Sequence, residues 1–317
     1  MRKKILITGG TGFVGRNLAL RLRDKYEVVL SARNNYFNNY AQRETGCMVV
    51  PLNVTSTDSI RDALNRCKPD ILIHAAATKY VDLAEVYPHE CIDINIIGSR
   101  NIANAAAERN LELVIGISTD KAARPCNNIY GMSKAMMEKI FLLMNNQSAT
   151  RFTCVRFGNV VWSTGSVLPV WKGMLQKAGK IKTSGPHMRR FFFSVHDACE
   201  MIEDALDNPG LLQGKVLARH MKSVQISSLL ERFVALNGGT HEIIEPVFGE
   251  SVDEIMIGES EYSFTSNINL NNHSYFLIDY DVKQSIGLKE PFTTYNAERL
   301  SSEEMDRLIS EEYNNYI

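Results

Sequence analysis

The stretch "ITGGTGFVG" at residues 7–15 decides the fold class of this 317-residue chain. It overlaps the end of the apolar run "KILIT" (4–8) and places Gly9, Gly12 and Gly15 at a Gly-x-x-Gly-x-x-Gly spacing. Glycines at such a turn let the backbone approach a diphosphate closely, and the N-terminus of the following helix stabilises its charge. A strand, this loop and a helix in succession therefore predict a dinucleotide site rather than an ordinary structural turn.

Apolar runs alternate with helical patterns beyond this loop. In the first helical pattern Val14, Leu18 and Leu22 recur every four residues, as one buried stripe requires. The expected strands are 4–8, 27–32, 48–53, 70–76, 111–119 and 152–159, and the expected helices are 13–25, 57–67, 90–109 and 130–146. Short, nearly all-apolar strands between helices are typical of a parallel sheet covered on both faces. The sequence therefore predicts an α/β fold with a doubly wound parallel (Rossmann) sheet.

The pattern becomes less regular after about residue 160. Helices are expected at 196–208, 227–239 and 301–313, and a strand at 214–220. We expect residues 1–165 to form the dinucleotide-binding domain, with parts of 192–222 returning to it. Residues 166–317 then form a smaller C-terminal substrate-binding region, and a cleft is expected between the two.

The composition excludes several classes of protein. The 35 Lys and Arg residues nearly balance the 36 Asp and Glu residues, so no overall field favours nucleic acid or an anionic membrane. The six cysteines form no Cys-x-x-Cys pair, which indicates a reduced cytoplasmic protein without a disulfide framework or a metal site. No apolar run reaches the ~18 to 20 residues of a spanning helix, and the N-terminal run is too short for a signal peptide. We expect a cytoplasmic protein with no membrane insertion.

The end of the second expected strand bears on the choice of cofactor. An NAD enzyme usually offers an acidic residue there to the ribose hydroxyls, but the sequence "SARNN" contains none. Ser31 and Arg33 are instead suited to a 2′-phosphate, which favours NADP over NAD. The alternative is that Arg33 is a solvated loop residue.

Tyr130 and Lys134 are four positions apart on the first turn of an expected helix. A free tyrosine, with a pKa of about 10, is a poor base at neutral pH. Lys134 on the same helix face and the positive charge of the nicotinamide would both favour the phenolate. Tyr130 would then accept the proton of an alcohol that loses a hydride, and Thr119 or Ser118 would orient that alcohol. Otherwise Tyr130 is a packing residue and Lys134 a surface residue.

Nearly the whole chain resembles the extended short-chain dehydrogenase/reductase family, in its polysaccharide-biosynthesis branch of UDP-N-acetylglucosamine 4,6-dehydratases. The most specific element of this resemblance is Thr119-Asp120-Lys121, which simple dehydrogenases and 4-epimerases do not usually carry. The other matching stretches are "GGTGFVG", "HAAATKYV", "STDKAARP", "YGMSK", "RFGNVV", "MRRFFFSVHDA" and "YNAERLSSEEM".

The resemblance implies a role for a second acid and base. Such enzymes oxidise carbon 4 of the sugar, and the new ketone acidifies the proton on carbon 5. Lys121 would remove that proton, while protonated Asp120 would donate to the departing 6-hydroxyl. A lysine beside an aspartate acts as a base only if burial lowers its pKa or a proton is shared within the pair. The alternative is an exposed ion pair that contributes little.

The resemblance also implies contacts to the cofactor and the substrate. Besides Tyr130 and Lys134, the expected cofactor residues are Gly9, Thr11, Gly12, Phe13, Val14, Gly15, Ser31, Arg33, Asn53, Val54, Ala75, Ala76 and Ala77. Asn159 and Arg190 would bind the substrate diphosphate, Glu250 would lie near the nucleotide ribose, and Lys79 would line the sugar pocket. Each of these four is otherwise an ordinary surface residue. We expect His74 to be a core residue, and Met132, Met136 and Met137 to pack the helix.

The chain departs from the pattern of this family at several positions. The spacing from Asp120 to Tyr130 is one residue longer than usual. Trp162 replaces a frequent glycine, and Arg189 replaces a small hydroxyl residue. Ser251 and Asp253 replace the lysine and histidine of a "Gly-Glu-Lys-Leu-His-Glu" stretch. These departures weaken the choice of UDP, relative to a GDP-linked sugar, more than the choice of reaction.

Three functions are weighed. The first is an NDP-N-acetylhexosamine 4,6-dehydratase in surface-polysaccharide biosynthesis. The second is a sugar-nucleotide 4-epimerase or 4-dehydrogenase, which needs Tyr130 but not Lys121. The third is a non-catalytic NADP-sensing module, which needs neither pair. Because the helices at 90–109 and 130–146 resemble a four-helix dimer interface of the family, we expect a homodimer or a higher homo-oligomer.

Overall fold

The computed structural model describes residues 2–244, 251–285 and 287–311. Within these ranges the central sheet has nine strands in the order β14-β15-β10-β6-β5-β4-β1-β2-β3. Its strands are β1 (Lys4–Thr8), β2 (Glu27–Ala32), β3 (Met48–Pro51), β4 (Ile71–His74), β5 (Leu113–Thr119), β6 (Arg151–Phe157), β10 (Val216–Arg219), β14 (Thr265–Leu270) and β15 (His273–Ile278). The strands from β3 to β10 are parallel, and the β14–β15 hairpin extends the sheet in antiparallel fashion.

The prediction of a doubly wound parallel sheet is confirmed. Strand order runs outward from β1 to β3 in one direction and from β4 to β10 in the other, so the direction reverses between β1 and β4. Ligands of such sheets bind outside the carboxyl ends of the strands at this reversal. The loop after β1 and the loop after β4 therefore delimit the expected site.

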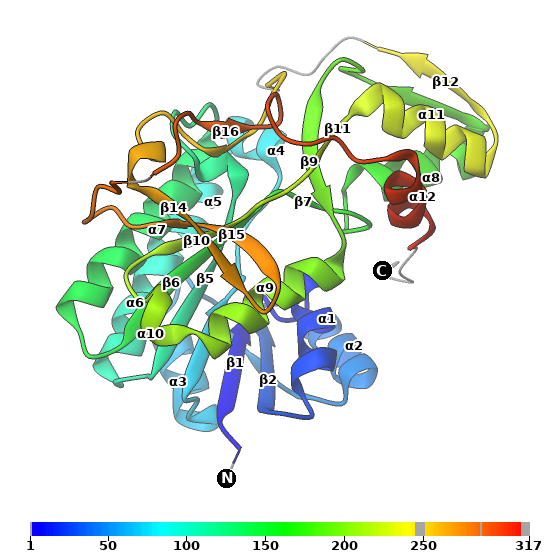
Figure 1. Cartoon of the computed structure of the whole chain (residues 1–317). Coiled ribbons are helices and arrows are strands. Elements are labelled where there is room, and N and C mark those ends of the chain that lie inside the picture. The colour runs from blue at the N-terminus through cyan, green and yellow to red at the C-terminus, as the bar shows by residue number, and fades with distance from the viewer. Residues whose placement is uncertain (1, 245–250, 286, 312–317) are drawn as a thin grey trace.

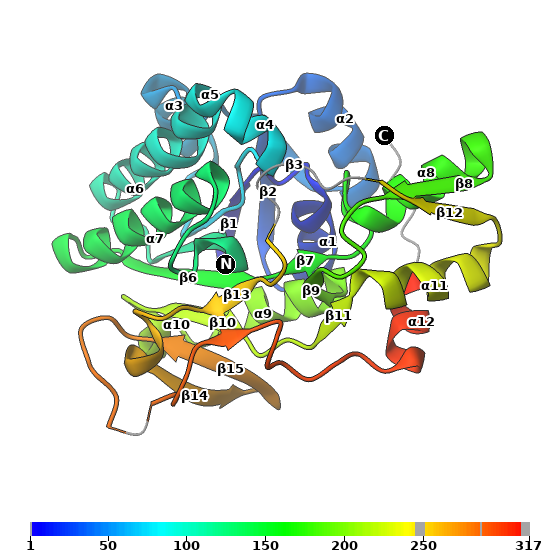
Figure 2. The same cartoon turned by 90° about the horizontal axis from the view of Figure 1, so that it is seen from above.

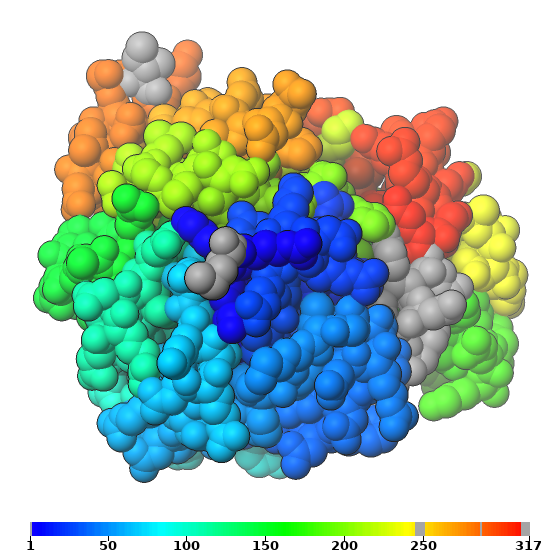
Figure 3. Space-filling view, turned by 90° about the horizontal axis from the view of Figure 1, so that it is seen from below, coloured from blue at the N-terminus to red at the C-terminus, as the bar shows by residue number. Residues whose placement is uncertain are grey.

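Helices cover both faces of the sheet (Figures 1 and 2). On one face α1 packs against α2 and α9, and on the other α6 packs against α3 and α7. Their bounds are α1 (Phe13–Leu22), α2 (Asn35–Thr45), α3 (Thr57–Cys67), α6 (Gly98–Glu108), α7 (Ile129–Gln147) and α9 (Val195–Asp207). Figure 3 shows the yellow-green residues near 200 beside the blue N-terminal residues, where Arg21 of α1 forms an ion pair with Glu203 of α9.

The expected helix at 90–109 is divided into three parts. After α4 (Val81–Val86), the chain forms α5 (Pro88–Cys91), a π-helical turn at Ile92–Ile97 and then α6. A π-helical turn carries one extra residue per turn, and such turns occur frequently at functional sites. Cys91 and Ile94, on the interrupted segment, both face the main cavity described below.

The remaining elements are β7 (Asn159–Val160), α8 (Val167–Ala178), β8 (Lys180–Thr183), β9 (Arg189–Phe193), α10 (Pro209–Leu212), β11 (Ser223–Gln225), α11 (Ile226–Asn237), β12 (Thr240–Ile243), β13 (Ile255–Ile257), β16 (Phe292–Thr293) and α12 (Ser302–Ser310). Most of the remaining elements lie beyond the carboxyl edge of the sheet, whereas α10 directly precedes β10 at the opposite edge. Strands β7, β9 and β11 form a small sheet, β8 pairs with β12, and β13 pairs with β16. Among the described helices, none combines the length and the apolar character needed to cross a bilayer.

Candidate active site

The loop after β1 has the geometry that a dinucleotide requires. Gly9 has a φ of +66°, and a Cβ there would lie 2.7 Å from the backbone of Ala76. A Cβ at Gly15 would lie 2.5 Å from the backbone of Gly10, so the loop packs directly against the start of α1. The first turn of α1 contains no acidic residue, and no side chain caps it at Gly12. Its backbone N–H groups and helix dipole therefore suit a bound anion, and the residues fit a dinucleotide cofactor.

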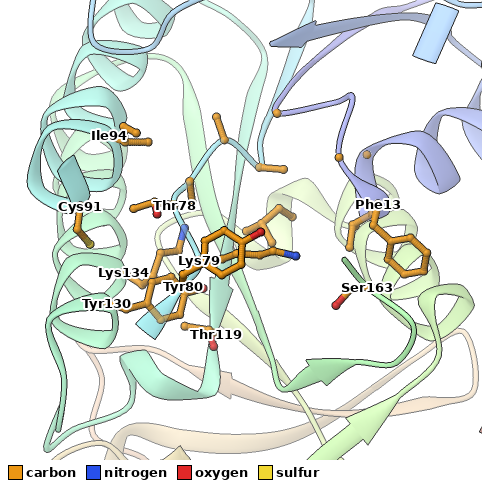
Figure 4. A pocket seen from close by; sticks show the side chains of 18 of the residues that line it. Phe13, Thr78, Lys79, Tyr80, Cys91, Ile94, Thr119, Tyr130, Lys134 and Ser163 are labelled. Atoms are coloured by element: carbon orange, nitrogen blue, oxygen red, sulfur yellow. The ribbon is translucent and has the colours of Figure 1, made fainter. Parts of the chain in front are cut away.

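A cavity of about 980 Å³ extends from this loop to the carboxyl ends of β4, β5 and β6. In Figure 4 Tyr130, Lys134 and Thr119 lie on one side of the cavity, with Phe13 and Ser163 on the other. The predicted site residues that line it are Gly9, Thr11, Gly12, Phe13, Val14, Gly15, Arg33, Val54, Ala75, Ala76, Ala77, Lys79, Thr119, Lys121, Tyr130, Lys134 and Asn159. Residues from the segments that follow six strands, β1 to β6, thus meet at one edge of the sheet.

Four predicted residues do not line this cavity, and a fifth, Glu250, lies outside the described residues. Ser31 is fully buried, and its hydroxyl donates to the carbonyl of Ile7 at 3.3 Å. The Asn53 side chain accepts from the backbone N–H and the hydroxyl of Thr55 at 3.2 and 3.0 Å. In this conformation the Ser31 hydroxyl joins β2 to β1 and the Asn53 side chain stabilises its own loop, so the contacts of both residues with a cofactor stay predictions. Asp120 and Arg190 are described below.

Tyr130 is fixed by interactions at the start of α7. The side chain of Asn128 accepts from Gly131 N at 2.7 Å, and Glu85 of α4 accepts from Ile129 N at 2.7 Å. Both bonds satisfy N–H groups that a helix N-terminus leaves without partners. Lys121 and Tyr130 line the same cavity despite the longer spacing between Asp120 and Tyr130. The extra residue does not separate the two groups.

The charges around Tyr130 differ from the expected ones. Burial raises the pKa of Tyr130 to about 12, while Lys121 and a hydrogen bond with Thr119 act in the opposite direction. Lys134 is not among the groups that shift it. Its Nζ contacts Met137 Sδ at 3.1 Å, and burial lowers its own pKa to about 8. Lys121 is therefore the cation with the largest effect toward the Tyr130 phenolate here.

Thr119, and not Ser118, has its hydroxyl beside the reactive groups. Thr119 Oγ1 donates to Asp120 Oδ1 at 2.8 Å and lines the cavity with Tyr130. Ser118 Oγ donates to the buried Glu138 at 2.6 Å and is committed to that bond. Thr119 is the better placed of the two to orient a substrate alcohol.

Asp120 is buried directly behind Thr119. Its Oδ1 accepts from the backbone N–H and the Nζ of Lys121, at 2.9 and 3.2 Å. Its Oδ2 has no hydrogen-bond partner among the described residues and would lie 3.3 Å from a Cβ at Gly158, a residue of the cavity wall. Burial raises the pKa of Asp120, and nearby Glu254 adds to this effect, which Lys121 opposes. Asp120 therefore holds a proton more readily than an exposed aspartate does.

Lys121 does not have the lowered pKa that a simple base requires. Burial acts to lower it, but Asp120 and Glu254 together outweigh burial and raise the pKa well above its ordinary value. Lys121 Nζ lies 3.2 Å from a carboxylate oxygen of each. The alternative of an exposed ion pair is contradicted, since the Asp120 side chain is fully buried and that of Lys121 is 16% exposed. A pKa of Lys121 lowered by burial is therefore contradicted. A proton shared between Lys121 and Asp120 remains as the way in which Lys121 acts as a base.

The predicted substrate residues have different environments. Lys79 Nζ donates to the carbonyl of Thr164 at 2.5 Å across the cavity, and burial lowers its pKa. Asn159 lines the cavity, and its amide donates to Phe191 O at 3.0 Å. Arg190 does not reach the cavity, because its guanidinium donates to backbone carbonyls of Arg189 and Ser251. The contact of Arg190 with a substrate diphosphate stays a prediction.

Three departures from the family pattern have a structural explanation. Arg189 and Asp253 form a bidentate ion pair, with N–O distances of 2.6 and 2.5 Å, so two unusual residues neutralise each other. Trp162 has a φ of +60°, a conformation that glycine adopts readily and other residues rarely. Its buried indole donates to Leu308 O of α12 at 2.9 Å, which fixes α12 to the loop after β7.

The predictions that His74 and three methionines of α7 have only structural roles have different outcomes. His74 is a core residue, as predicted: it is fully buried, it bonds Thr8 and Ser99, and burial lowers its pKa to about 3. Met137 packs in the core, but Met132 and Met136 are about half exposed. Their packing within this chain is therefore contradicted.

Sequence reasoning missed several residues of the site. The most important is Glu254, at the end of the stretch in which Ser251 and Asp253 were noted. Its signal was the final glutamate of the "Gly-Glu-Lys-Leu-His-Glu" pattern, which this chain retains. The other missed residues that line the cavity include Thr78, Tyr80, Tyr87, Cys91, Ile94, Phe157, Val160 and Ser163. Most are apolar or weakly polar, so their types alone carry no functional signal.

Comparison with known proteins gives consistent relatives. A UDP-N-acetylglucosamine 4,6-dehydratase (inverting) from Campylobacter jejuni is 31% identical over 290 residues, which cover 89% of this chain and 84% of that protein. A capsular polysaccharide biosynthesis protein, CapD, from Staphylococcus aureus is 32% identical over 82% of this chain. This match spans only 46% of the CapD length.

The fold has a close counterpart among solved structures. The X-ray structure of Pen from Bacillus thuringiensis superposes with a TM-score of 0.87 at 24% identity, over 97% of both chains. Residues 5–270 match the family described as "Polysaccharide biosynthesis protein". The fold, the family match over most of the chain and the 31% identical dehydratase agree, and the chain belongs to the polysaccharide biosynthesis protein family.

Proposed function

We propose that the protein is an NDP-N-acetylhexosamine 4,6-dehydratase of surface-polysaccharide biosynthesis. UDP-GlcNAc is the first candidate substrate, since a relative that is 31% identical bears this substrate in its name. The observation that carries the proposal is the shared cavity of Tyr130 and Lys121, with Asp120 directly behind them. Oxidation or epimerisation at carbon 4 needs only the tyrosine, so a buried acid–base pair beside it supports a further elimination step.

The roles of the residues follow from these positions. The glycine loop after β1 would hold a nicotinamide cofactor, whose chemistry would be to take up a hydride from carbon 4 and give it back at carbon 6. Tyr130 takes the proton of the 4-hydroxyl, which Thr119 orients. Neutral Lys121 takes the proton of carbon 5, while protonated Asp120 donates to the 6-hydroxyl, which leaves as water. As carbon 6 gains the hydride, the Lys121 ammonium returns a proton to carbon 5, and the product is a 4-keto-6-deoxy sugar.

The pair reaches this protonation state by an internal transfer. Moving one proton from the Lys121 ammonium to the Asp120 carboxylate, over 3.2 Å, gives a neutral amine and a carboxylic acid without any change of net charge. The raised pKa of Asp120, which burial causes, favours this transfer. The two groups titrate together rather than independently.

The assignment of cofactor, regions and assembly completes the proposal. The cofactor is NADP, because Arg33 lines the adenosine end of the cavity and no carboxylate accompanies it there. Residues 1–165 hold the cofactor, and residues 166–317, except the parts of 192–222 that return to the sheet, hold the nucleotide sugar.

Two copies associate through α6 and α7, where exposed Met132, Met136 and Leu143 lie on one face of α7. Six free cysteines, five of them buried, suit a cytoplasmic location.

Mass spectrometry of the purified protein incubated with UDP-GlcNAc and with GDP-GlcNAc tests the proposal. A 4,6-dehydratase gives a product lighter by one water and accumulates no reduced cofactor. A 4-epimerase gives unchanged mass, and a 4-dehydrogenase gives reduced cofactor in proportion to product. A protein that binds NADP but converts neither sugar would support the sensing module instead.

A further inference from the structure

Glu254 contacts the predicted acid–base pair from a different part of the chain. Its Oε1 lies 3.2 Å from Lys121 Nζ and 3.3 Å from Arg190 Nε. The side chain is only 9% exposed. Lys121 is thus held between Asp120 on one side and Glu254 on the other.

The backbone around Glu254 is rigidly attached. Glu254 N donates to Thr294 Oγ1 at 3.0 Å, and Glu254 O accepts from Thr294 N at 2.9 Å. Four residues later in the chain, Gly258 packs so closely on Arg124 that a Cβ would lie 1.9 Å from the Arg124 carbonyl oxygen. The carboxylate therefore has a fixed position relative to the Asp120–Ala122 turn.

Four charged or titratable groups face the Lys121 ammonium. Asp120 and Glu254 stabilise its positive charge, Arg190 opposes them, and Tyr130 shares the cavity. At separations of about 3 Å in a mostly buried site, such interactions are strong and weakly screened. Removing one carboxylate must therefore change how readily Lys121 releases its proton.

We propose that Glu254 is a positioning residue, which holds Lys121 against Asp120 and sets how the proton is divided between them. This inference rests on the proposed dehydratase function. A proton that leaves the Lys121 ammonium for Asp120 gives the amine that takes the proton of carbon 5 and the acid that protonates the departing hydroxyl. Glu254 stabilises the Lys121 ammonium and also raises the pKa of Asp120, so it acts on both groups between which the proton is divided.

A substitution that keeps the shape and removes the charge tests the proposal. In Glu254→Gln the pKa of Lys121 should fall, and the rising limb of the pH profile of water loss should move to lower pH by about 1 unit or more. The matched control is Asp253→Asn, the neighbouring carboxylate, which pairs with Arg189 and not with Lys121. The rising limb of the pH profile of Asp253→Asn should stay at the pH of the unmodified enzyme. Glu254→Asp keeps the charge and should restore most of the original limb.

A second readout is independent of turnover. Lysine labelled with ¹³C at the ε carbon reports the titration of each amine by NMR, and the Lys121 signal is assigned by its loss in Lys121→Met. The Lys121 midpoint should be lower in Glu254→Gln than in the unmodified holoenzyme, with an unchanged melting temperature as the check on folding. Equal midpoints in the two proteins, or equal pH limbs, would overturn the role of Glu254. If the unmodified enzyme releases no water from either sugar nucleotide, the proposed function fails instead, whereas the NMR result still measures the Glu254–Lys121 interaction.

Discussion

Lys121 distinguishes a dehydratase from an epimerase at the scale of one residue. Lys121→Ala should abolish water loss but leave NADP bound, because the glycine loop that holds the diphosphate lies at the other end of the cavity. Removal of the cation should also raise the pKa of Tyr130, since Lys121 lowers it in the unmodified protein. Oxidation at carbon 4 should then require a higher pH. Product mass and cofactor fluorescence measure the two effects, and full dehydratase turnover in this variant would refute the assignment.

The proposed choice of NADP rests on Arg33. It is exposed and lines the cavity, as Phe37 does. A 2′-phosphate at this position would be solvated unless the Arg33 cation paired with it. Arg33→Gln should weaken NADP binding by about tenfold or more, as the loss of a charge-assisted hydrogen bond predicts. NAD binding should change little. Calorimetric titration with both cofactors tests this, and an equal loss for NAD and NADP would remove Arg33 from the phosphate site.

Gly131 controls the fit between two elements, α7 and the 3₁₀ turn at Asp120–Ala122. A Cβ at Gly131 would lie 2.1 Å from the carbonyl oxygen of Lys121, which is closer than any real contact. Gly131→Ala should displace the turn from Tyr130, reduce water loss severely and destabilise the fold by about 1–3 kcal/mol. Gly173→Ala in α8 is the control, since nothing lies within 4 Å of its added Cβ. Turnover and melting temperature should separate the two variants.

The elements predicted from the sequence are those whose apolar pattern is strong. Strand β1 occupies the predicted 4–8, and helix α3 the predicted 57–67. Helix α2 was missed because "NYFNNYAQRET" is mostly polar, although Asn34 caps it by accepting from Tyr36 and Phe37 N–H groups. The β14–β15 hairpin was missed because its turn residues, Asn271 and Asn272, with φ of +46° and +68°, were read only as part of an Asn-rich segment.

The site was predicted well where spacing fixes geometry and poorly where the fold brings distant segments together. Tyr130 and Lys121 could be placed in one cavity because both follow the same strand, β5. Glu254 comes from a segment more than a hundred residues away, and its contact with Lys121 depends on how β13 packs. The direction of the Lys121 pKa shift therefore could not be derived from its neighbours in sequence.

At the scale of the whole molecule, a buried charge network joins the C-terminal segment to the central sheet. Arg156 of β6 is fully buried between Glu138 of α7 and Glu261, with N–O distances of 2.7 and 2.9 Å. It also donates to Met256 O at 3.0 Å. Breaking such a network leaves carboxylates buried without a counter-ion, so Arg156→Met should cost about 3–5 kcal/mol of unfolding free energy. Denaturant titration measures it, with exposed Arg151→Met as the control.

The same network predicts that stability depends on pH with opposite signs in the unmodified protein and in Arg156→Met. Burial acts to raise the pKa of Glu261, but Arg156 and hydrogen bonds prevail and lower it. Its contribution to stability is thus present above the unfolded pKa of about 4.3 and is lost as pH falls through the folded value. In Arg156→Met burial acts unopposed by that cation, the folded pKa rises, and stability should instead decrease as pH rises through it.

The exposed face of α7 predicts how two molecules associate. Met132, Met136 and Leu143 are 54%, 49% and 55% exposed, and their helical positions differ by less than half a turn. We expect a second copy of this chain to cover the face. Helix α6 packs beside α7 and widens the same surface.

A charge placed on this face should separate the copies. In Leu143→Glu the carboxylate would be desolvated at the interface without a counter-ion. The dissociation constant of the oligomer should therefore increase by about tenfold or more, which corresponds to about 1.4 kcal/mol. Sedimentation velocity at several concentrations measures this. Leu211→Glu on α10 adds the same charge at a similarly exposed leucine and should leave the assembly intact. Equal sedimentation of both variants and the unmodified protein would show that α7 is not the interface. Tyr130 lies on the first turn of this helix, so loss of the partner should also reduce turnover if the interface holds α7 in place.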